Sequence, residues 1–308
     1  MSAATIELVL FTVITASTPL LLAALGEIVT ERSGVTNLGV EGMMALGAAL
    51  GFAVAYQTGS TLIGALAGAG AGMALAALFA ALALGLATNQ VATGLALTIL
   101  GLGASGLVGA RFVGLKRDGA PRLAIPGLSD LPIVGKLVFG HDAFVYAAIA
   151  LTAAVAWFLA RSRAGLALRA IGDNHASAHA LGLKVLRTRL AALLFGGACA
   201  GLAGAYLSLA YTPFWAPGMT AGRGWIALAL VVFASWRPWR ALAGALLFGA
   251  ATTLQLHAQA SGKIALPGQL MSALPYLVTI FALILLSVID RRGSAAPASL
   301  GKPFTPDR

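Results

Sequence analysis

The chain has 308 residues, of which 59% are hydrophobic and only 10% are charged. Soluble domains carry about 25% charged residues, so this composition excludes a soluble globular protein and indicates a polytopic membrane protein. The net charge of +10 comes from cations between apolar runs, which favours membrane topology over nucleic-acid binding as its explanation.

Nine apolar stretches of the chain are candidate membrane spans, each of which needs about 20 residues. They are residues 5–25, 36–56, 60–87, 91–110, 143–160, 190–211, 224–235, 241–256 and 270–289. The seventh and eighth are short, and the third is long enough to tilt, to bend or to include a re-entrant piece. We therefore expect an all-α membrane domain over residues 1–290 with about eight to ten transmembrane helices. Small residues such as Gly64, Gly68 and Gly72 favour close helix packing.

The second span opens on the sequence Asn37-Leu38-Gly39-Val40-Glu41-Gly42. Glu41 lies at or just inside the membrane boundary, where a charged side chain is costly and usually faces a protein interior or a pathway. The neighbouring glycines would let the helix break there and expose backbone groups to a cavity. The alternative is an interfacial acid that is stabilised by the dipole of its own helix N-terminus.

Asn89 and Gln90 join the third and fourth spans across a very short turn. Their side-chain amides can both donate to and accept from a polar solute, and Asn37 offers the same chemistry. We expect these three amides to lie on a solute path. The alternative is that Asn89 and Gln90 satisfy helix ends, which is a common use of such residues.

Residues 111–142 form a long polar segment in which Pro121, Pro126 and Pro132 indicate an extended, turn-rich loop. We expect this loop outside the cell. It is either a platform for an extracytoplasmic partner or a passive connector.

Residues 161–189 form the other long polar segment, with six Lys and Arg against the single acid Asp173. The positive-inside rule makes this segment a cytoplasmic loop. Alternating the remaining loops from there places thirteen Lys and Arg inside and seven outside. The N-terminus is then outside and the C-terminal tail inside.

Within this loop, Gly172-Asp173-Asn174 is a turn and helix-cap signal. We expect a short helix from Ala176 to Leu181, ended by Gly182 in the C′ position. Such a capped helix suits docking on a soluble partner, and a solvated basic linker is the alternative.

His175 and His179 have the i, i+4 spacing of a metal pair. No nearby cysteine or carboxylate pair completes such a site, and the single cysteine, Cys199, lies in an apolar run. We therefore expect neither a metal nor a cofactor.

Residues 39–48 (GVEGMMALGA) and 221–230 (AGRGWIALAL) resemble each other, with Arg223 in the place of Glu41. The expected topology runs them in opposite directions, which indicates an inverted repeat, although Gly/Ala-rich sequences also match by chance. Prolines and a glycine disfavour continuous helix before Arg223. We expect Glu41 and Arg223 to hold two broken segments in register, and a charge pair between them is one way to do so.

The tail at 291–308 is rich in Pro, Ser and Ala, so we expect it to be disordered in the cytoplasm. The sequence contains no Walker A motif, catalytic triad or paired carboxylates. We therefore do not expect an enzyme, and any ATP hydrolysis belongs to another subunit.

Four stretches in this order together resemble an ABC-transporter permease of the branched-chain amino acid, ribose and simple-sugar permease family. They are ERSGVTNLGVEGMMALGA, ATNQVATGLALTILGLG, LRAIGDNHASAHALGLKVLRTRLAALLFGGACAGLAGAYLSL and APGMTAGRGWIALALVVFASWRP. The resemblance runs from about residue 26 to 238 and more loosely to 291. It is nearest to the nucleoside or simple-sugar permeases that work beside binding lipoproteins.

The resemblance implies the type II ABC importer fold with inverted-repeat halves, in a bacterial plasma (inner) membrane. It implies cytoplasmic ATP-binding subunits, a second permease subunit or a homodimer, and an extracytoplasmic solute-binding protein. The transported solute would be a nucleoside or a simple sugar. The residues that it places against the ATP-binding subunit are Arg169, Gly172, Asp173, Asn174 and Gly182. The alternative function is an ion-coupled secondary transporter, for which Glu41 would be the single intramembrane carboxylate.

Overall fold

The computed structural model describes residues 3–123, 134–261 and 296–305, with isolated positions between 273 and 284. The described residues form helices, turns and loops, and their β-structure is limited to three isolated bridges. The helices are α1 (Ala3–Arg32), α2 (Val40–Thr58), α3 (Thr61–Ala80), α4 (Gln90–Gly109), α5 (Val134–Phe139), α6 (Ala143–Arg161), α7 (Arg163–Asp173), α8 (His175–Ala180), α9 (Val185–Tyr206), α10 (Arg223–Phe233) and α11 (Pro238–Ser261).

Seven of the described helices are long and apolar enough to cross a membrane, namely α1, α2, α3, α4, α6, α9 and α11. The third predicted span is one continuous helix, since α3 runs on through a π-helical turn to Gly85. Helix α10 is short, as predicted, whereas α11 is long enough to span and exceeds its predicted bounds. The predicted span 270–289 lies outside the described residues, apart from isolated positions. The all-α membrane fold is thus confirmed.

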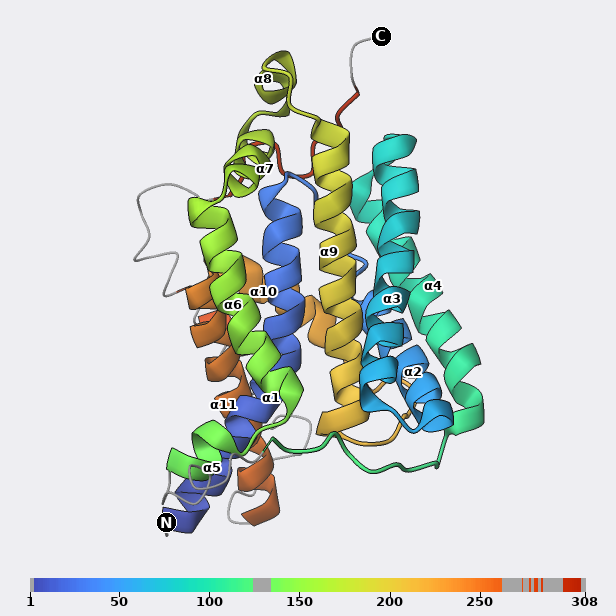
Figure 1. Cartoon of the computed structure of the whole chain (residues 1–308), viewed down its shortest axis with the longest axis vertical. Coiled ribbons are helices and arrows are strands. Elements are labelled where there is room, and N and C mark those ends of the chain that lie inside the picture. The colour runs from blue at the N-terminus through green and yellow to red at the C-terminus, as the bar shows by residue number, and fades with distance from the viewer. Residues whose placement is uncertain are drawn as a thin grey trace.

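Helix α9 runs through the middle of the bundle, beside α1, α2 and α3 (Figure 1). A Cβ atom built on Gly72 would meet the carbonyl oxygen of Gly197, and one built on Gly68 would meet Ala205. In a bilayer no hydrophobic effect drives helices together, because lipid tails are as apolar as the side chains. Close approach of the backbones, with its van der Waals contacts, stabilises helix packing instead. The small-residue spacing predicted from the sequence therefore packs α3 against α9, and Gly64 likewise packs α3 against Ala55 of α2.

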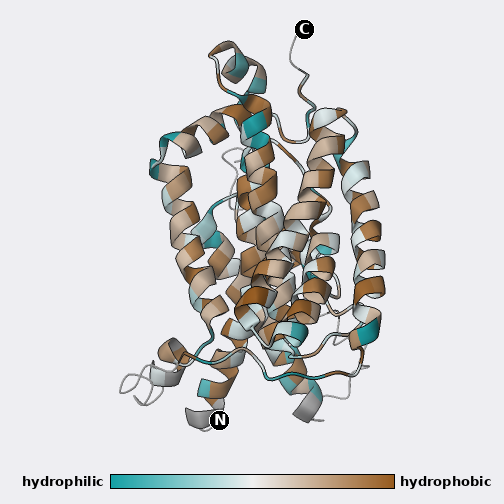
Figure 2. Ribbon diagram, turned by 45° about the vertical axis from the view of Figure 1, so that its right-hand side comes forward, coloured by the Kyte–Doolittle hydropathy of each residue, from teal (hydrophilic) through white to brown (hydrophobic). Residues whose placement is uncertain are grey.

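The connecting segments gather at the two ends of the bundle (Figure 1). At one end, which we call the α8 end, lie the turn at 33–35, α7, α8 and residues 296–305. At the other, the α5 end, lie the start of α1, α5 and residues 113–122, which form isolated bridges to 214–215. These segments lie at the ends where the predicted alternation of loops puts them, and which end faces the cytoplasm stays a prediction. Figure 2 shows hydrophobic residues along the helices between these ends.

The C-terminal tail differs from the sequence-based expectation of disorder. Residues 296–305 pack against the α8 end, where Ser299 and Leu300 are largely shielded from solvent. The backbone N–H of Ser299 donates to the carbonyl of Gly172, and that of Gly301 donates to the carbonyl of Gly34. The expectation was wrong for these residues because composition does not reveal a backbone surface, built by distant segments, that can accept their hydrogen bonds.

Candidate functional site

Two non-helical segments enter the bundle and start a helix inside it. After α1 the chain turns at Gly34 and returns beside α1, where the Asn37 N–H donates to the Glu27 carboxylate at 3.3 Å, and α2 then begins. Residues 212–222 enter from the α5 end, and α10 begins at Arg223. From this junction α2 leads toward the α5 end (Figure 1). Helix α10 leads toward the α8 end, where Trp236 donates to Glu31 near the end of α1, so the two helices run in the opposite directions that an inverted repeat requires.

Glu41 joins these two segments. Its carboxylate accepts the Thr220 hydroxyl at 2.6 Å and the backbone N–H groups of Gly222 at 2.9 Å and Gly224 at 2.6 Å. These N–H groups belong to the first turn of α10, which carries the positive end of the helix dipole. Glu41, only 4% exposed, is therefore an anionic cap for α10 supplied by α2. Its charge is satisfied by protein donors and is not presented to a solute.

The same junction leaves no room for a side chain at Gly224. A Cβ atom there would lie 2.5 Å from the Glu41 Cα and 2.6 Å from its backbone nitrogen. Because the obstructing atoms are backbone, neither helix end can yield by a rotamer change. The glycine in the Arg-Gly-Trp sequence thus sets the distance between α2 and α10.

Arg223 does not pair with Glu41, contrary to one arrangement predicted from the sequence. Its guanidinium donates to the carbonyls of Met219 at 2.9 Å and Thr220 at 3.4 Å, and lies 5.7 Å from the Tyr211 ring centroid. Both oxygens of Glu41 already accept from groups around Arg223, namely the Thr220 hydroxyl and the N–H groups of Gly222 and Gly224. Arg223 instead stabilises the non-helical segment that precedes its own helix.

The three predicted pathway amides occupy different settings. Asn37 is fully buried, and its Oδ1 accepts the Gly39 N–H at 2.9 Å, which shapes the entry to α2. Gln90 is 3% exposed; its Oε1 accepts the Thr36 N–H at 2.8 Å, and its Nε2 has no hydrogen-bond partner among the described residues. Asn89 is exposed and caps α4 through the Ala92 N–H at 3.0 Å. Asn37 and Gln90 therefore flank one returning segment, whereas Asn89 lies at a helix end.

A cavity of about 130 Å³ lies beside the Glu41 junction, between α2, α4 and residues 215–220. Its polar side chains are Ser105 and Thr220, and its remaining wall includes Leu102, Trp215 and Met219. The predicted pathway residues do not line it. Sequence reasoning missed Ser105 and Thr220, although the proline and glycine at 217–218 already indicated a break in the helix where this cavity forms.

The predicted coupling segment forms a capped helix. Asn174 caps α8 by accepting the Ser177 N–H at 3.0 Å. At the other end, Gly182 adopts φ +82°. The Gly182 N–H donates to the backbone carbonyl of His179, and the Leu183 N–H donates to the backbone carbonyl of Ala178. This is a Schellman C-cap, so Gly182 occupies the C′ position that the sequence predicted. The helix itself begins and ends one residue earlier than expected.

Helix α7, which precedes this cap, was not predicted. Ser162 caps its start by accepting the Gly165 N–H at 2.8 Å, and Leu168 and Ile171 bury its apolar face. Gly172 packs against the carbonyl of Arg32, so α7 lies directly on the turn that leads toward Glu41. The cap serine followed by an apolar i, i+3 pattern was the signal that could have revealed it.

Two other predicted coupling residues lie in α7. Arg169 is partly buried, and its Nε atom lacks a hydrogen-bond partner within the described parts of the chain. The side chain of Asp173 is exposed, and its carbonyl accepts the Ser299 hydroxyl at 3.2 Å.

His175 and His179 face Phe304 of the tail, with ring centroids 5.2 and 5.3 Å from its ring. The Nδ1 atom of His175 accepts from the guanidinium of Arg189 at 3.2 Å. Burial lowers the pKa of His175, and the cations Arg189 and Lys302 lower it further. His175 is therefore neutral at pH 7, as an acceptor from arginine must be.

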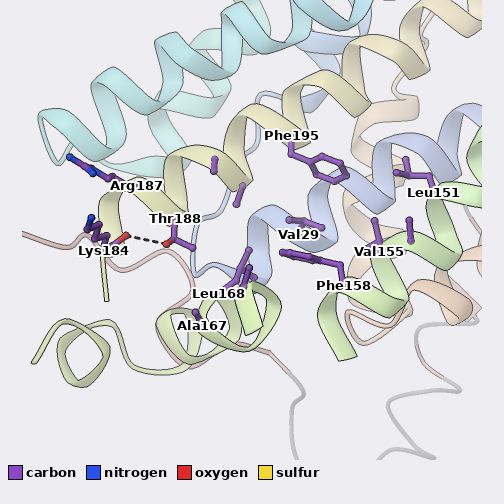
Figure 3. A pocket seen from close by; sticks show the side chains of 14 residues that line it. Val29, Leu151, Val155, Phe158, Ala167, Leu168, Lys184, Arg187, Thr188 and Phe195 are labelled. Atoms are coloured by element: carbon purple, nitrogen blue, oxygen red, sulfur yellow. Dashed lines mark hydrogen bonds between the residues drawn. The ribbon is translucent and has the colours of Figure 1, made fainter. Parts of the chain in front are cut away.

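A larger cavity, of about 660 Å³, lies between α1, α6, α7 and α9 (Figure 3). Its wall is apolar, with side chains such as Val29, Phe158 and Phe195, and Lys184 and Arg187 stand at the end nearest α8. Such a surface does not suit a polar solute, because few groups could replace the hydrogen bonds that the solute makes to water. The smaller cavity beside Glu41 is therefore the better candidate for a polar solute.

Comparison with known proteins gives consistent matches over the whole chain. A family model described as "Branched-chain amino acid transport system / permease component" matches residues 9–283. A putative glucose ABC transporter permease of Haloferax volcanii is 44% identical, over 87% of this chain and 88% of the relative. A guanosine ABC transporter permease of Bacillus subtilis is 31% identical, over 93% and 92%. A nucleoside ABC transporter permease of Lactococcus lactis subsp. cremoris is 30% identical, over 91% and 92%. No solved structure matches the chain.

Proposed function

This chain belongs to the family described as "Branched-chain amino acid transport system / permease component", and we propose that it carries a nucleoside or a simple sugar into the cell. As an ABC permease it is a multi-pass protein of the plasma membrane and a transport subunit, not an enzyme. Its family implies ATP-binding subunits and a substrate-binding protein as partners. Three points are our proposal: the identity of the solute, the pairing of permease subunits, and the residues that contact each partner.

One observation carries the choice of solute: the carboxylate of Glu41 is consumed by the three donors of the α10 cap. The adjoining cavity then offers neutral groups beside apolar wall: the hydroxyl of Ser105, and the oxygen of Thr220 as an acceptor, since its proton is donated to Glu41. Neutral hydroxyl-rich molecules match such a lining, since they exchange hydrogen bonds without burying a charge. The names of the relatives, which refer to glucose, guanosine and nucleosides, support the same class.

The same observation argues against the ion-coupled alternative. A coupling cation needs a carboxylate or unwound carbonyls that remain free to coordinate it. Glu41 was the residue on which that alternative depended, and its oxygens already accept from Thr220, Gly222 and Gly224. Two further buried carboxylates, Glu27 and Glu31 of α1, likewise accept from protein donors, the Asn37 N–H and the Trp236 indole N–H.

For the transport cycle, we propose that the α8 end faces the cytoplasm and that α8 docks on the ATP-binding subunit. Closure of the ATP-binding subunits would move α7 and α8 against the turn at 33–35, which contacts α7 at Gly172. That turn continues into α2, so the movement reaches the junction of α2 and α10. A second permease, either homologous or identical, would complete the path, with the substrate-binding protein at the α5 end.

The test is uptake by the permease, reconstituted into liposomes with its ATP-binding subunits and binding protein. We expect ATP-dependent entry of radiolabelled guanosine or radiolabelled glucose. A proton or sodium gradient without ATP should drive none, and gradient-driven uptake would establish the ion-coupled alternative instead.

Ser105→Ala should raise the KM for uptake about fivefold through loss of one hydroxyl contact. The control, Thr152→Val, removes a buried hydroxyl that binds its own helix at Ala148 and should leave KM unchanged. Equal effects of the two variants would show that the cavity is not on the path.

A further inference from the structure

Arg189, near the start of α9, is a buried charge that nothing in the sequence singled out. It is fully buried, and its guanidinium donates in three directions. Nε donates to the carbonyl of Ser33 at 3.1 Å, Nη1 to the carbonyl of Lys302 at 3.2 Å, and Nη2 to His175 Nδ1 at 3.2 Å. One side chain thus joins the turn after α1, the C-terminal tail and helix α8.

The tail strengthens this connection through contacts of its own. The Ser299 N–H donates to the Gly172 carbonyl at 2.8 Å, and the Gly301 N–H donates to the Gly34 carbonyl at 3.1 Å. Phe304 packs beside both histidines of α8 and joins a small apolar cluster that includes Ile171 and Ala178. This cluster is separate from the main membrane core, so the tail completes the packing of the α7–α8 unit.

These contacts differ in what they reach. Helix α7 touches the turn at 33–34 directly, through Gly172. Among the described residues, α8 has no hydrogen bond of its own to that turn, and apart from its connection through α7 it is linked to the turn by Arg189 and the tail. A few residues after this turn, the chain reaches Asn37 and then Glu41.

We propose that Arg189 and residues 299–304 form a strap that fixes α8 to the turn at 33–34 and transmits its movement to the Glu41 junction. Arg189 is a positioning residue in this device, and Phe304 anchors the tail on α8. The inference rests on the proposed docking of α8 on an ATP-binding subunit.

The chemistry of Arg189 supports a joining role over a merely tolerated charge. Burying a guanidinium is costly unless its donors are satisfied, and here they reach two carbonyls and an imidazole. Its planar fork reaches three separated acceptors at once, whereas the ammonium of lysine, a compact point charge, cannot. Arg189→Lys should therefore keep the positive charge but lose the simultaneous hydrogen bonds to Ser33, Lys302 and His175.

The experiment compares Phe304→Ala, Arg189→Lys and a chain that ends after Pro297, each in the complete complex with its ATP-binding subunits and binding protein. The readouts are complex assembly, basal ATP hydrolysis, its stimulation by the loaded binding protein, and uptake. We expect all three variants to assemble and to keep basal hydrolysis. Stimulation and uptake should fall about tenfold, the size of a typical coupling between sites.

Lys302→Ala is the matched control, because Lys302 contributes its backbone carbonyl to Arg189 and its side chain is exposed. It should behave as the wild type. Phe304→Tyr keeps the ring and should restore stimulation.

Wild-type stimulation in both Phe304→Ala and the shortened chain would overturn the strap. Loss of assembly or of basal hydrolysis in Phe304→Ala would also overturn it, since the tail would then belong to the docking surface. Failure of the proposed solute is separately visible, because the wild-type complex itself would then show neither uptake nor stimulation with guanosine or glucose, whereas failure of the strap leaves the wild type active and the variants equal to it.

Discussion

Glu41 and Arg189 are two buried charges that the protein satisfies in opposite ways. Glu41 accepts from the N–H groups that begin α10, and Arg189 donates to the carbonyls of two non-helical segments. Neither has an ion-pair partner within the described parts of the chain, and each joins segments that lie more than a hundred residues apart. These two buried charges therefore connect segments that are distant in the sequence rather than form a pair.

The two connectors differ in setting. The Glu41 junction lies inside the bundle, where Gly224 brings backbone against backbone and leaves little freedom. The Arg189 junction lies at the α8 end, with the imidazole of His175 as one partner and the tail as another. We infer that the inner junction sets the structure of the solute path and the outer one its connection to the partner.

The largest effect is expected from Glu41→Gln. The amide places an NH₂ group against backbone donors and removes the charge that caps α10, which should destabilise the fold by about 1–3 kcal/mol for each donor left without an acceptor. Thermal unfolding in detergent and uptake both measure it. The double variant Glu41→Gln/Arg223→Gln should recover nothing, because the two residues do not pair. Recovery would restore the ion pair that the sequence suggested.

Gly224→Ala should be the next largest, because its Cβ would overlap the Glu41 backbone. Overpacking of this kind costs about 1–3 kcal/mol and should separate the ends of α2 and α10. Gly103→Ala is the control, since a Cβ there meets nothing within 4 Å and alanine favours helix. Unfolding midpoints that fall equally in both variants would mean that the close approach is not essential.

Asn174→Ala tests the outer region alone. Loss of the α8 cap should cost about 1 kcal/mol locally and speed hydrogen exchange at 175–183 without changing overall stability.

Asn89→Ala removes a capping hydrogen bond of the same length, 3.0 Å, from the start of α4. If Asn89 lies on the solute path, its variant raises the KM for uptake, and an unchanged KM assigns Asn89 to helix capping.

The smallest effect is a pH dependence of tail docking. The pKa of His175 is lowered in the folded protein by burial, Arg189 and Lys302, with His179 and Phe304 also facing it. The folded protein therefore holds His175 in its neutral form. This contribution to stability is fully present above the ordinary histidine pKa of about 6.5, and it is lost as pH falls through the lowered pKa of His175 in the folded protein. Protection of the 299–304 amides, taken relative to the intrinsic exchange rate at each pH, should fall between pH 7 and 5. The same loss of protection in His175→Gln would assign it to another group.

Features of the chain that depend on neighbours in sequence could be predicted from the sequence. The apolar runs gave eight of the described helices, and the signals at Asn174 and Gly182 predicted α8 and its two caps. The glycines around Glu41 and the prolines before Arg223 predicted that two segments are broken. These predictions succeed because a helix, a cap or a turn is stabilised mainly by hydrogen bonds within a few residues.

The partners of the buried charges could not be predicted in this way. Opposite signs at matching positions suggested that Glu41 pairs with Arg223, but the register of α2 against α10 presents backbone N–H groups to the carboxylate. Composition suggested a disordered tail, but Gly34, Gly172 and Arg189 offer it hydrogen-bond partners. Backbone donors and acceptors are the same for every residue type, so the sequence carries no local sign of which ones will meet. Tertiary packing alone brings them within reach.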